Sequence, residues 1–205
     1  MFYEPKHGHG LPYDPFKAIV APRPIGWIST LNSRGVANLA PYSFFNAMAT
    51  SPHMVGFTSI GYKHSIENAR DTGEFVFNLA TLPLADEMNR SSIGTDSNVS
   101  EFEVAGIDAL PSLIVKPPRV AKSPASLECR LVHFLEFHDI DGRPTDRYLA
   151  VGQVVGVHID ERFLVKGRFD SASAQSLARC GYRDYSVLDK VFEMCPPDEA
   201  TKLIT

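Results

Sequence analysis

Two stretches in which the side chains alternate between two faces, joined by a segment typical of a turn, constrain the fold of this 205-residue chain more than any other feature. Within Ala125–Phe137 one set of alternate positions is occupied by Leu127, Cys129, Leu131, His133, Leu135 and Phe137. This period of two is typical of a half-buried antiparallel strand. Val132 and Phe134 belong to the other set, which indicates that the second face also meets something apolar. Asp139–Thr145 predicts a hairpin loop, after which Tyr148–Ile159 returns with one face made of Leu149, Val151, Val155, Val157 and Ile159.

The rest of the chain carries further short strand patterns, namely Ile25–Thr30, residues 36–45, His53–Ile60 and Glu74–Ala80. Helical patterns cover His64–Asp71 and Leu84–Arg90, with one short helix expected within 91–112 and a Ser/Ala-rich one in the tail, 171–195. At least six strands with short hairpins, and helices only at the margins, predict a mainly β fold built on an antiparallel barrel. We expect a single domain over residues 1–205, with a core of about 17–182, an N-terminal arm and a C-terminal tail.

Charge and cysteine content exclude several functional classes. Twenty Lys and Arg against 24 Asp and Glu give a net charge of −4, which offers no large basic surface for nucleic acid or an anionic membrane. Cys129, Cys180 and Cys195 have no close spacing, so we expect neither a disulfide framework nor a metal site. No run approaches the roughly 18 apolar residues of a membrane span. The first residues also lack a signal-peptide pattern, so we expect a cytoplasmic protein.

The chain lacks the local signatures of common nucleophilic and dinucleotide-binding enzymes. It has no Gly-x-Ser-x-Gly elbow, no Walker loop and no Gly-x-Gly-x-x-Gly loop. A nucleotide would therefore need another kind of site, and we assign no catalytic acid or base.

The densest set of polar and aromatic side chains falls between residues 22 and 81. Each of them alone is most simply a strand or turn residue that satisfies backbone groups. Together they offer hydroxyls, amides, one lysine and an aromatic cluster, which suits a planar heteroaromatic ligand carrying a phosphate. A lysine, hydroxyls and the N-terminus of a helix beginning near Ser65 would bind the phosphate. The candidate binding residues are Trp27, Ser29, Thr30, Asn38, Pro41, Tyr42, Ser43, Phe44, Phe45, Ser59, Lys63, His64, Ser65 and Asn68.

Three segments of this region resemble the flavin reductase-like family, which includes the flavoredoxins. They are PRPIGWIST, NLAPYSFFNAMATSPHMVGF and KHSIENARDTGEFVFNLAT. Arg179-Cys180-Gly181-Tyr182 with Tyr185 is also similar to the family's closing Arg-x-Gly-Gly…Tyr pattern. The resemblance covers roughly residues 20–182. It implies a six-stranded split barrel, usually a homodimer, that holds FMN non-covalently near the subunit interface.

The resemblance also implies roles for individual residues. The isoalloxazine ring would be lined by Ser43, Phe44 and Phe45, with Asn38 behind them and Ser29 and Thr30 on the neighbouring strand. The phosphate-side positions of the family match Ser59, Lys63 and Ser65. His64 stands where the family often has Asp, and it adds a pH-dependent contact. Two interpretations of Trp27 stay open, a cover over the site and a core residue.

The function that the resemblance implies is an NAD(P)H-dependent flavin reductase, in which a nicotinamide nucleotide passes hydride to FMN. The electrons would continue to free flavin, to oxygen, or to a partner oxygenase or redox protein. Two alternatives stay open. One is an FMN-binding electron carrier that a partner protein reduces, and the other is a non-enzymatic flavin-binding module.

Overall fold

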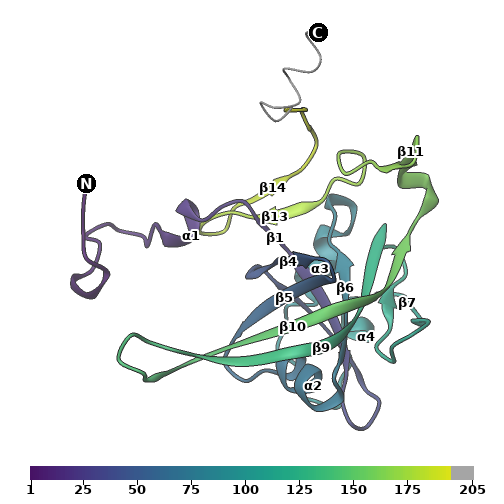
Figure 1. Cartoon of the computed structure of the whole chain (residues 1–205), viewed down its shortest axis with the longest axis horizontal. Helices are drawn as coiled ribbons and strands as arrows, with labels where there is room; N and C mark the ends of the chain where they lie inside the picture. The colour runs from purple at the N-terminus through teal and green to yellow at the C-terminus, as the bar shows by residue number, and fades with distance from the viewer. Residues whose placement is uncertain (195–205) are drawn as a thin grey trace.

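The computed structural model of the chain describes residues 1–194, and its central feature is a seven-stranded antiparallel sheet that curls into a split barrel (Figure 1). The strand order is β3-β2-β6-β9-β10-β5-β4. In chain order these strands are β2 (Gly26–Leu31), β3 (Ala37–Tyr42), β4 (Phe45–Thr50), β5 (His53–Ile60), β6 (Glu74–Leu79), β9 (Ala125–His138) and β10 (Pro144–Ile159). The predicted mainly β barrel is confirmed, and β4 is a strand that the sequence patterns did not predict.

The remaining elements are short and surround the barrel. One small sheet consists of β1 (Arg23–Pro24), β13 (Leu177–Arg179) and β14 (Tyr185–Val187). A two-stranded sheet is formed by β7 (Ala109–Leu110) and β8 (Arg119–Val120), and another by β11 (Leu164–Val165) and β12 (Arg168–Phe169). The helices are α1 (Phe16–Ile19), α2 (His64–Thr72), α3 (Ala85–Arg90) and α4 (Glu101–Ala105), with 3₁₀ turns η1 (Pro5–His7), η2 (Leu82–Leu84) and η3 (Glu161–Phe163). Within residues 1–194, no helix is long and apolar enough to cross a membrane.

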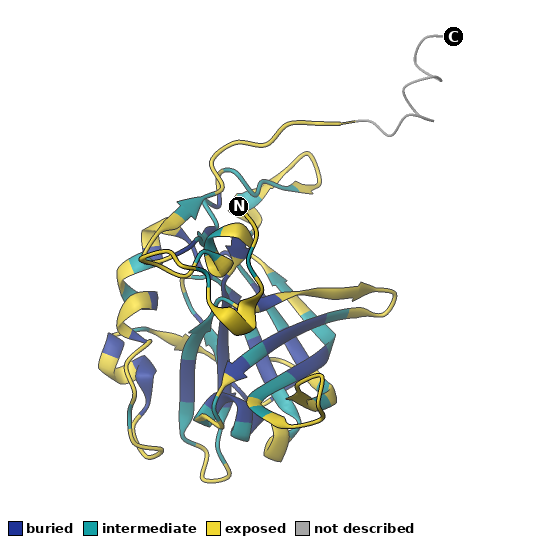
Figure 2. Ribbon diagram, turned by 90° about the vertical axis from the view of Figure 1, so that its left-hand side faces the viewer, coloured by how far each residue is buried: buried dark blue, intermediate teal, exposed yellow. Residues whose placement is uncertain are grey.

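Strand β2 is buried on both faces and separates two hydrophobic cores. Figure 2 shows the buried residues gathered in the strands of the barrel and exposed residues on the projecting hairpin and loops. Trp27 points into the outer core, which also contains Ile25, Leu39, Leu84, Met88, Phe102, Val120 and Leu177. Ile28, the next residue, points into the barrel interior together with Phe45, Val55, Phe57, Ile66, Phe75 and Cys129. Because successive side chains of a strand alternate between faces, one short strand anchors both cores.

Gly26 is required by the close approach of Phe45, the first residue of β4. A Cβ atom at Gly26 would lie 2.5 Å from the Phe45 ring, a distance that side chains do not tolerate. Phe45 stacks on Phe77 of β6 with ring centroids 4.6 Å apart. The glycine of the PIGW segment therefore lets the start of β4 pack across β2.

Two β-bulges in the β9–β10 hairpin decide which of its side chains face the barrel. The register shifts by one residue at Val132 in β9 and at Val155 in β10. Beyond Val132, Phe134 packs toward the interior, whereas Leu135 and Phe137 are 50% and 41% exposed. The predicted alternation is therefore wrong beyond Leu131, because one extra residue exchanges the two faces of a strand.

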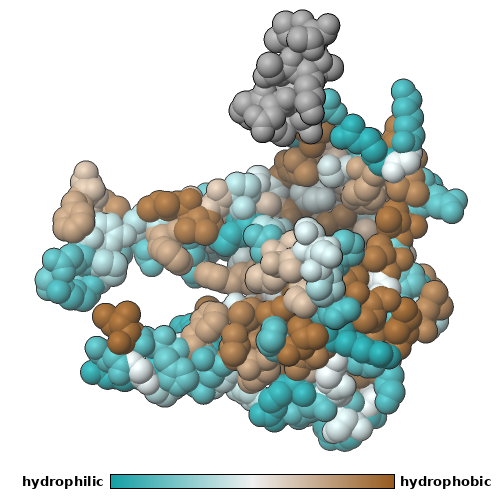
Figure 3. Space-filling view, viewed as in Figure 1, coloured by the Kyte–Doolittle hydropathy of each residue, from teal (hydrophilic) through white to brown (hydrophobic). Residues whose placement is uncertain are grey.

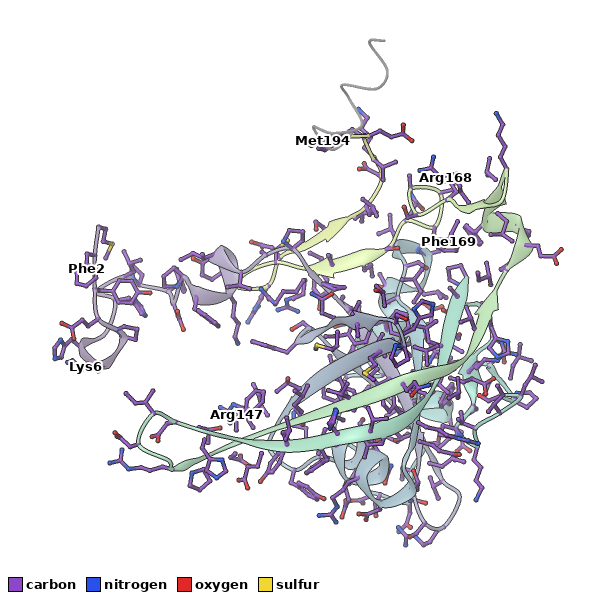
Figure 4. The ribbon with its side chains drawn as sticks, viewed as in Figure 1. Phe2, Lys6, Arg147, Arg168, Phe169 and Met194 are labelled. Carbon is purple, nitrogen blue, oxygen red and sulfur yellow. The ribbon has the colours of Figure 1, made fainter. Side chains whose placement is uncertain are left out.

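The predicted inward face of β10 is also wrong. Tyr148, Ala150 and Val154 contact the interior core, whereas Val157 and Ile159 from the predicted apolar set are exposed. The hairpin loop itself forms as predicted, since β9 ends at His138 and β10 begins at Pro144. Its distal part, from which Arg147 extends in Figure 4, projects beyond the barrel.

The C-terminal part of the described chain differs from the prediction. Residues 171–175 form turns rather than the predicted Ser/Ala-rich helix. The Asp170 carboxylate accepts hydrogen bonds from the Ser173 N–H and hydroxyl, and Gln175 has a φ of 51°. Such local side-chain bonds compete with helix formation. The last residue of the predicted tail segment, Cys195, lies outside the described residues.

Glu128 is a fully buried carboxylate on the outer face of β9 that fixes the loop after β7. It accepts hydrogen bonds from the N–H groups of Leu113, Ile114 and Val115 at 2.7, 2.6 and 2.9 Å, and it lies 2.5 Å from His158 Nε2. Burial alone would raise the pKa of Glu128, but these hydrogen bonds outweigh it and lower the pKa to about 2. The ionised form is therefore the stable form in the folded protein.

We predict that Glu128 contributes stability that acid removes. Because its folded pKa lies below the unfolded value, the contribution is complete above about pH 5 and is lost as pH falls toward about 2. Glu128→Gln should lower the unfolding free energy at pH 7 by about 1–3 kcal/mol and flatten its decline between about pH 5 and pH 2. Urea unfolding at a series of pH values measures both effects, with the exposed Glu103→Gln as the control. A decline in Glu128→Gln as steep as that of the parent would contradict the prediction.

Candidate functional site

A groove runs along the edge strand β3 and meets the start of α2. Its central chamber has a volume of about 400 Å³, within the range of small-molecule sites. One wall is formed by β3 from Asn38 to Tyr42, and the opposite side by residues 92–95. The segment Tyr62–Ser65, where α2 begins, closes one part of it.

Two smaller chambers extend the groove. The α2 chamber, of about 210 Å³, shares Asn38 and His64 with the central chamber and is lined by polar side chains such as Arg34 and Glu67. The arginine chamber, of about 190 Å³, shares Pro41 and Ser92 with the central one. Its other lining residues are Ile25, Ser43, Met88, Asn89, Arg179 and Tyr185. Shared walls make the three chambers one elongated site.

The N-terminus of α2 gives the central chamber a positive end. Lys63 is the N-cap residue, and its side chain makes no capping hydrogen bond. Within the described residues, the N–H groups of His64 and Ser65 have no hydrogen-bond acceptor, whereas those of Ile66 and Glu67 bond to the Lys63 carbonyl. Free N–H groups, the helix dipole and a lysine together favour an anion here.

Buried polar side chains hold α2 against the barrel. Asn38 Nδ2 donates to Ser65 Oγ at 2.7 Å, and Asn68 Nδ2 donates to Thr30 Oγ1 at 3.1 Å. The Ser59 hydroxyl donates to the Gly61 carbonyl at 2.8 Å and so shapes the turn before the helix. The first of these bonds connects β3 to α2, and the second connects β2 to α2.

Tyr42 joins this network from the end of β3. Burial raises the pKa of its phenol, and hydrogen bonds with Ser65 and Ser59 offset part of the effect. The phenol therefore stays protonated and acts as a fixed hydrogen-bonding group in the wall. Its ring packs against Phe57, with centroids 4.9 Å apart.

Three candidate residues of β2 lie behind the groove and do not line it. Trp27 is fully buried, and its indole N–H donates to Ser91 Oγ at 2.9 Å, so of its two interpretations the structure favours the core residue. Ser29 is buried and donates to the Pro118 carbonyl. Thr30 is buried against Asn68. These residues support the site through packing.

The two phenylalanines after Ser43 point to different places. Phe45 is buried in the barrel interior, whereas Phe44 is 38% exposed. The guanidinium of Arg23 lies 5.7 Å from the centroid of the Phe44 ring. The Phe44 carbonyl accepts the Thr58 N–H at 2.8 Å, which fixes the corner between β3 and β4.

Of the candidate set, the structure brings seven residues together in the central and arginine chambers, namely Asn38, Pro41, Tyr42, Ser43, Lys63, His64 and Ser65. Asn68 lines the α2 chamber, and Ser59 supports the turn before α2. No group of three or more His, Cys, Asp or Glu side chains within residues 1–194 is arranged to hold a metal ion.

Sequence reasoning missed several lining residues, among them Tyr62, Ile93 and Glu101. Glu101 is buried at the start of α4, where its carboxylate accepts the Leu39 N–H at 3.1 Å and the Thr95 hydroxyl at 2.5 Å. It therefore ties the loop before α4 to β3. The only signal for this role was a Ser100-Glu101 pair before an apolar residue, which marks a helix start and predicts no contact with a distant strand.

Residues 20–172 match the model of the flavin reductase like domain. Among solved structures, nitrilotriacetate monooxygenase component B of Bacillus cereus superposes with a TM-score of 0.86 at 26% identity, covering 95% of this chain and 98% of that chain. The 2-nitrobenzoate 2-nitroreductase of Pseudomonas fluorescens gives 0.83 at 26% identity, with 96% of each chain covered. Flavoredoxin of Desulfovibrio vulgaris (Miyazaki F) gives 0.77 at 16% identity over 97% of this chain and 100% of that chain, a likeness of fold alone.

Proposed function

The chain belongs to the flavin reductase-like family, and on this premise we propose that it binds FMN non-covalently in the groove along β3 and reduces it with NADH or NADPH. The observation that carries this proposal is the meeting of a helix N-terminus, with two free N–H groups and a lysine, and an elongated groove. A flavin mononucleotide needs both, a cationic end for its phosphate and a long slot for its ring.

At the phosphate end, Lys63 would supply charge, and the N–H groups of His64 and Ser65 would donate hydrogen bonds. The Ser65 hydroxyl already accepts a hydrogen bond from Asn38, and the Ser65 N–H has no acceptor and is the group for a phosphate.

At the ring end, Pro41 and Ser43 would border the isoalloxazine on the β3 side, and Ile93 on the opposite side. FMN, when bound, supplies the hydride chemistry of the reaction. The protein's residues orient the ring and exclude water from it. Glu101 is a positioning residue in this scheme, because it holds residues 92–95 against β3 through Thr95 and Leu39.

We further propose that the electrons pass to free flavin or to a partner oxygenase or redox protein. The Bacillus cereus structure supports this, since it is a component of a monooxygenase. Cytoplasmic location is also part of the proposal. Cys129 and Cys180 are free thiols, which suits a reducing compartment.

We predict that the protein purified with FMN is yellow and that NADH or NADPH bleaches it under anaerobic conditions. Stopped-flow absorbance near roughly 450 nm, where flavins absorb, measures the reduction. If neither nucleotide changes the absorbance but a redox partner protein does reduce the flavin, the protein is an electron carrier and not a reductase. A protein that stays colourless after soaking with FMN would contradict flavin binding altogether.

Lys63→Ala should weaken FMN binding by about 1–3 kcal/mol, because it removes a charge from the phosphate end. Fluorescence titration of the flavin gives the dissociation constant. Lys116→Ala removes the same charge from an exposed position outside the groove and serves as the matched control. Equal FMN affinities in the two variants would remove Lys63 from the phosphate site.

We also propose that the protein is a homodimer in which the β9–β10 hairpin contacts the second copy. The β9–β10 hairpin and the N-terminal arm project to the same side of the barrel, and Figure 3 shows open space between them. Val132, Leu135 and Phe137 on this hairpin are 41%, 50% and 41% exposed. Exposed apolar side chains on a projecting arm are typical of surfaces that another chain covers, and a second copy would cover them here.

We predict that Leu135→Asp shifts the protein from dimer to monomer, because it places a charge on the exposed face of the hairpin. Sedimentation velocity measures the mass. Leu113→Asp, at a leucine that is 82% exposed on the loop after β7, is the matched control and should leave the dimer intact. A Leu135→Asp protein that still sediments as a dimer counts against this interface.

A further inference from the structure

The arginine chamber is lined by Arg179, whose positive charge the proposed FMN site does not use. Arg23 of β1 and Arg179 of β13 are directly opposite each other in the antiparallel register. Side chains at opposed positions emerge on the same face with Cβ atoms about 4.5–5.5 Å apart. Like charges in this arrangement destabilise a sheet unless something compensates them.

Within the described residues, no carboxylate compensates either arginine. Arg23 is 8% exposed and donates only to backbone carbonyls, those of Lys17, Val20 and Cys180. Its buried Nε has no hydrogen-bond partner. The lining of the chamber includes no Asp or Glu. An anion that entered the chamber from solvent would therefore meet the unneutralised guanidinium of Arg179, with the buried Arg23 on the neighbouring strand.

The two arginines make hydrogen bonds to different parts of the chain. Arg23 connects the N-terminal arm to the end of β13, since its carbonyl partners come from both segments. Arg179 has partners only within its own hairpin: it donates to the Tyr185 hydroxyl at 2.5 Å and to the Tyr182 carbonyl at 2.6 Å. The Tyr185 ring also lies 4.5 Å below its guanidinium.

These contacts hold the Arg179 guanidinium in place without neutralising it. A planar cation that is already fixed loses little conformational entropy on binding and offers a forked pair of donors to a carboxylate or phosphate. The arginine chamber adjoins Pro41 and Ser43, where the proposed ring site ends. A ligand bound to Arg179 would therefore lie beside the flavin, at a different chamber from Lys63.

We propose that Arg179, with Arg23 behind it, binds the carboxylate or phosphate of a planar co-substrate that lies next to the flavin ring. This inference rests on the proposed function for the identity of the neighbouring ring, but the anion site itself does not. The chamber volume of about 190 Å³ suits one ring with its anionic group. The shared chemistry is a planar anion, and its two sources are an aromatic acid and a nicotinamide nucleotide.

The test compares pairs of probes of which one member carries a carboxylate or phosphate and the other does not. Isothermal titration of the FMN-loaded protein is carried out with benzoate and benzamide, and with nicotinamide mononucleotide and nicotinamide riboside. Arg179→Gln should weaken binding of at least one anionic probe by about tenfold to a hundredfold and leave binding of benzamide and nicotinamide riboside, which carry no anionic group, unchanged. Arg179→Lys should recover only part of the affinity, because it restores charge without the planar fork.

Arg183→Gln is the matched control, because Arg183 is exposed on the same segment and does not line the chamber. It should bind all four probes as the parent does. Loss of benzoate affinity alone identifies an aromatic acid, and loss of mononucleotide affinity alone identifies the nicotinamide nucleotide. Equal affinities for the probes with and without an anionic group, or unchanged anion affinity in Arg179→Gln, would overturn the proposal.

The FMN dissociation constant is measured on the same variants. An unchanged value in Arg179→Gln is expected, and a large increase would overturn the assignment by placing Arg179 in the FMN site. If the parent protein binds no FMN, the proposed function fails. The benzoate and benzamide titrations, repeated without FMN, then still decide whether Arg179 forms an anion site.

Discussion

The burial of β2 on both faces is the constraint on which the rest of the structure depends. Trp27 and Ile28 point into different cores, so the strand cannot tilt or slide without opening one of them. Strand β3 lies beside β2 at the edge of the sheet. Its other side pairs with no strand in the described part of the chain. Glu101 bonds to the Leu39 N–H on that side, and the groove forms along the rest of the strand. The groove is thus a consequence of where the sheet ends.

Local patterns predicted most of the elements because strands and helix caps have short-range signals. The predicted strand Ile25–Thr30 is β2 within one residue at each end, and the predicted helix His64–Asp71 is α2 with one further residue. Two failures share a different cause. The bulge at Val132 exchanged the faces of β9, and β4 follows a sharp corner at Phe44. Neither a bulge nor a corner leaves a periodic signal, because each depends on the strand opposite.

The sequence located the candidate site but did not distinguish residues that line it from residues that support it. Ser29 and Ser43 are both hydroxyls in motif segments, yet Ser29 is buried against Pro118 and Ser43 lines the arginine chamber. A sequence motif includes residues that line a site and also buried residues that support it through hydrogen bonds. Only the register of β2 against β3, with Ser29 opposite Leu39, shows which side of the sheet each residue serves. The role of Arg179 depends similarly on its pairing with Arg23, a partner 156 positions earlier in the chain.

Placement of charge explains how a mildly acidic chain can suit anionic ligands. The net charge of −4 excludes a general positive field, so attraction must be local. Of the cations that line the groove, Lys63 lies in the central chamber and Arg179 in the arginine chamber. One phosphate cannot compensate both if they lie in different chambers. On the proposed function, the groove would hold two anionic molecules, one bound at Lys63 and one at Arg179, with their planar parts meeting beside Pro41 and Ser43. That arrangement is what a reaction between two ring systems requires, because it brings the rings together while holding their negative groups apart.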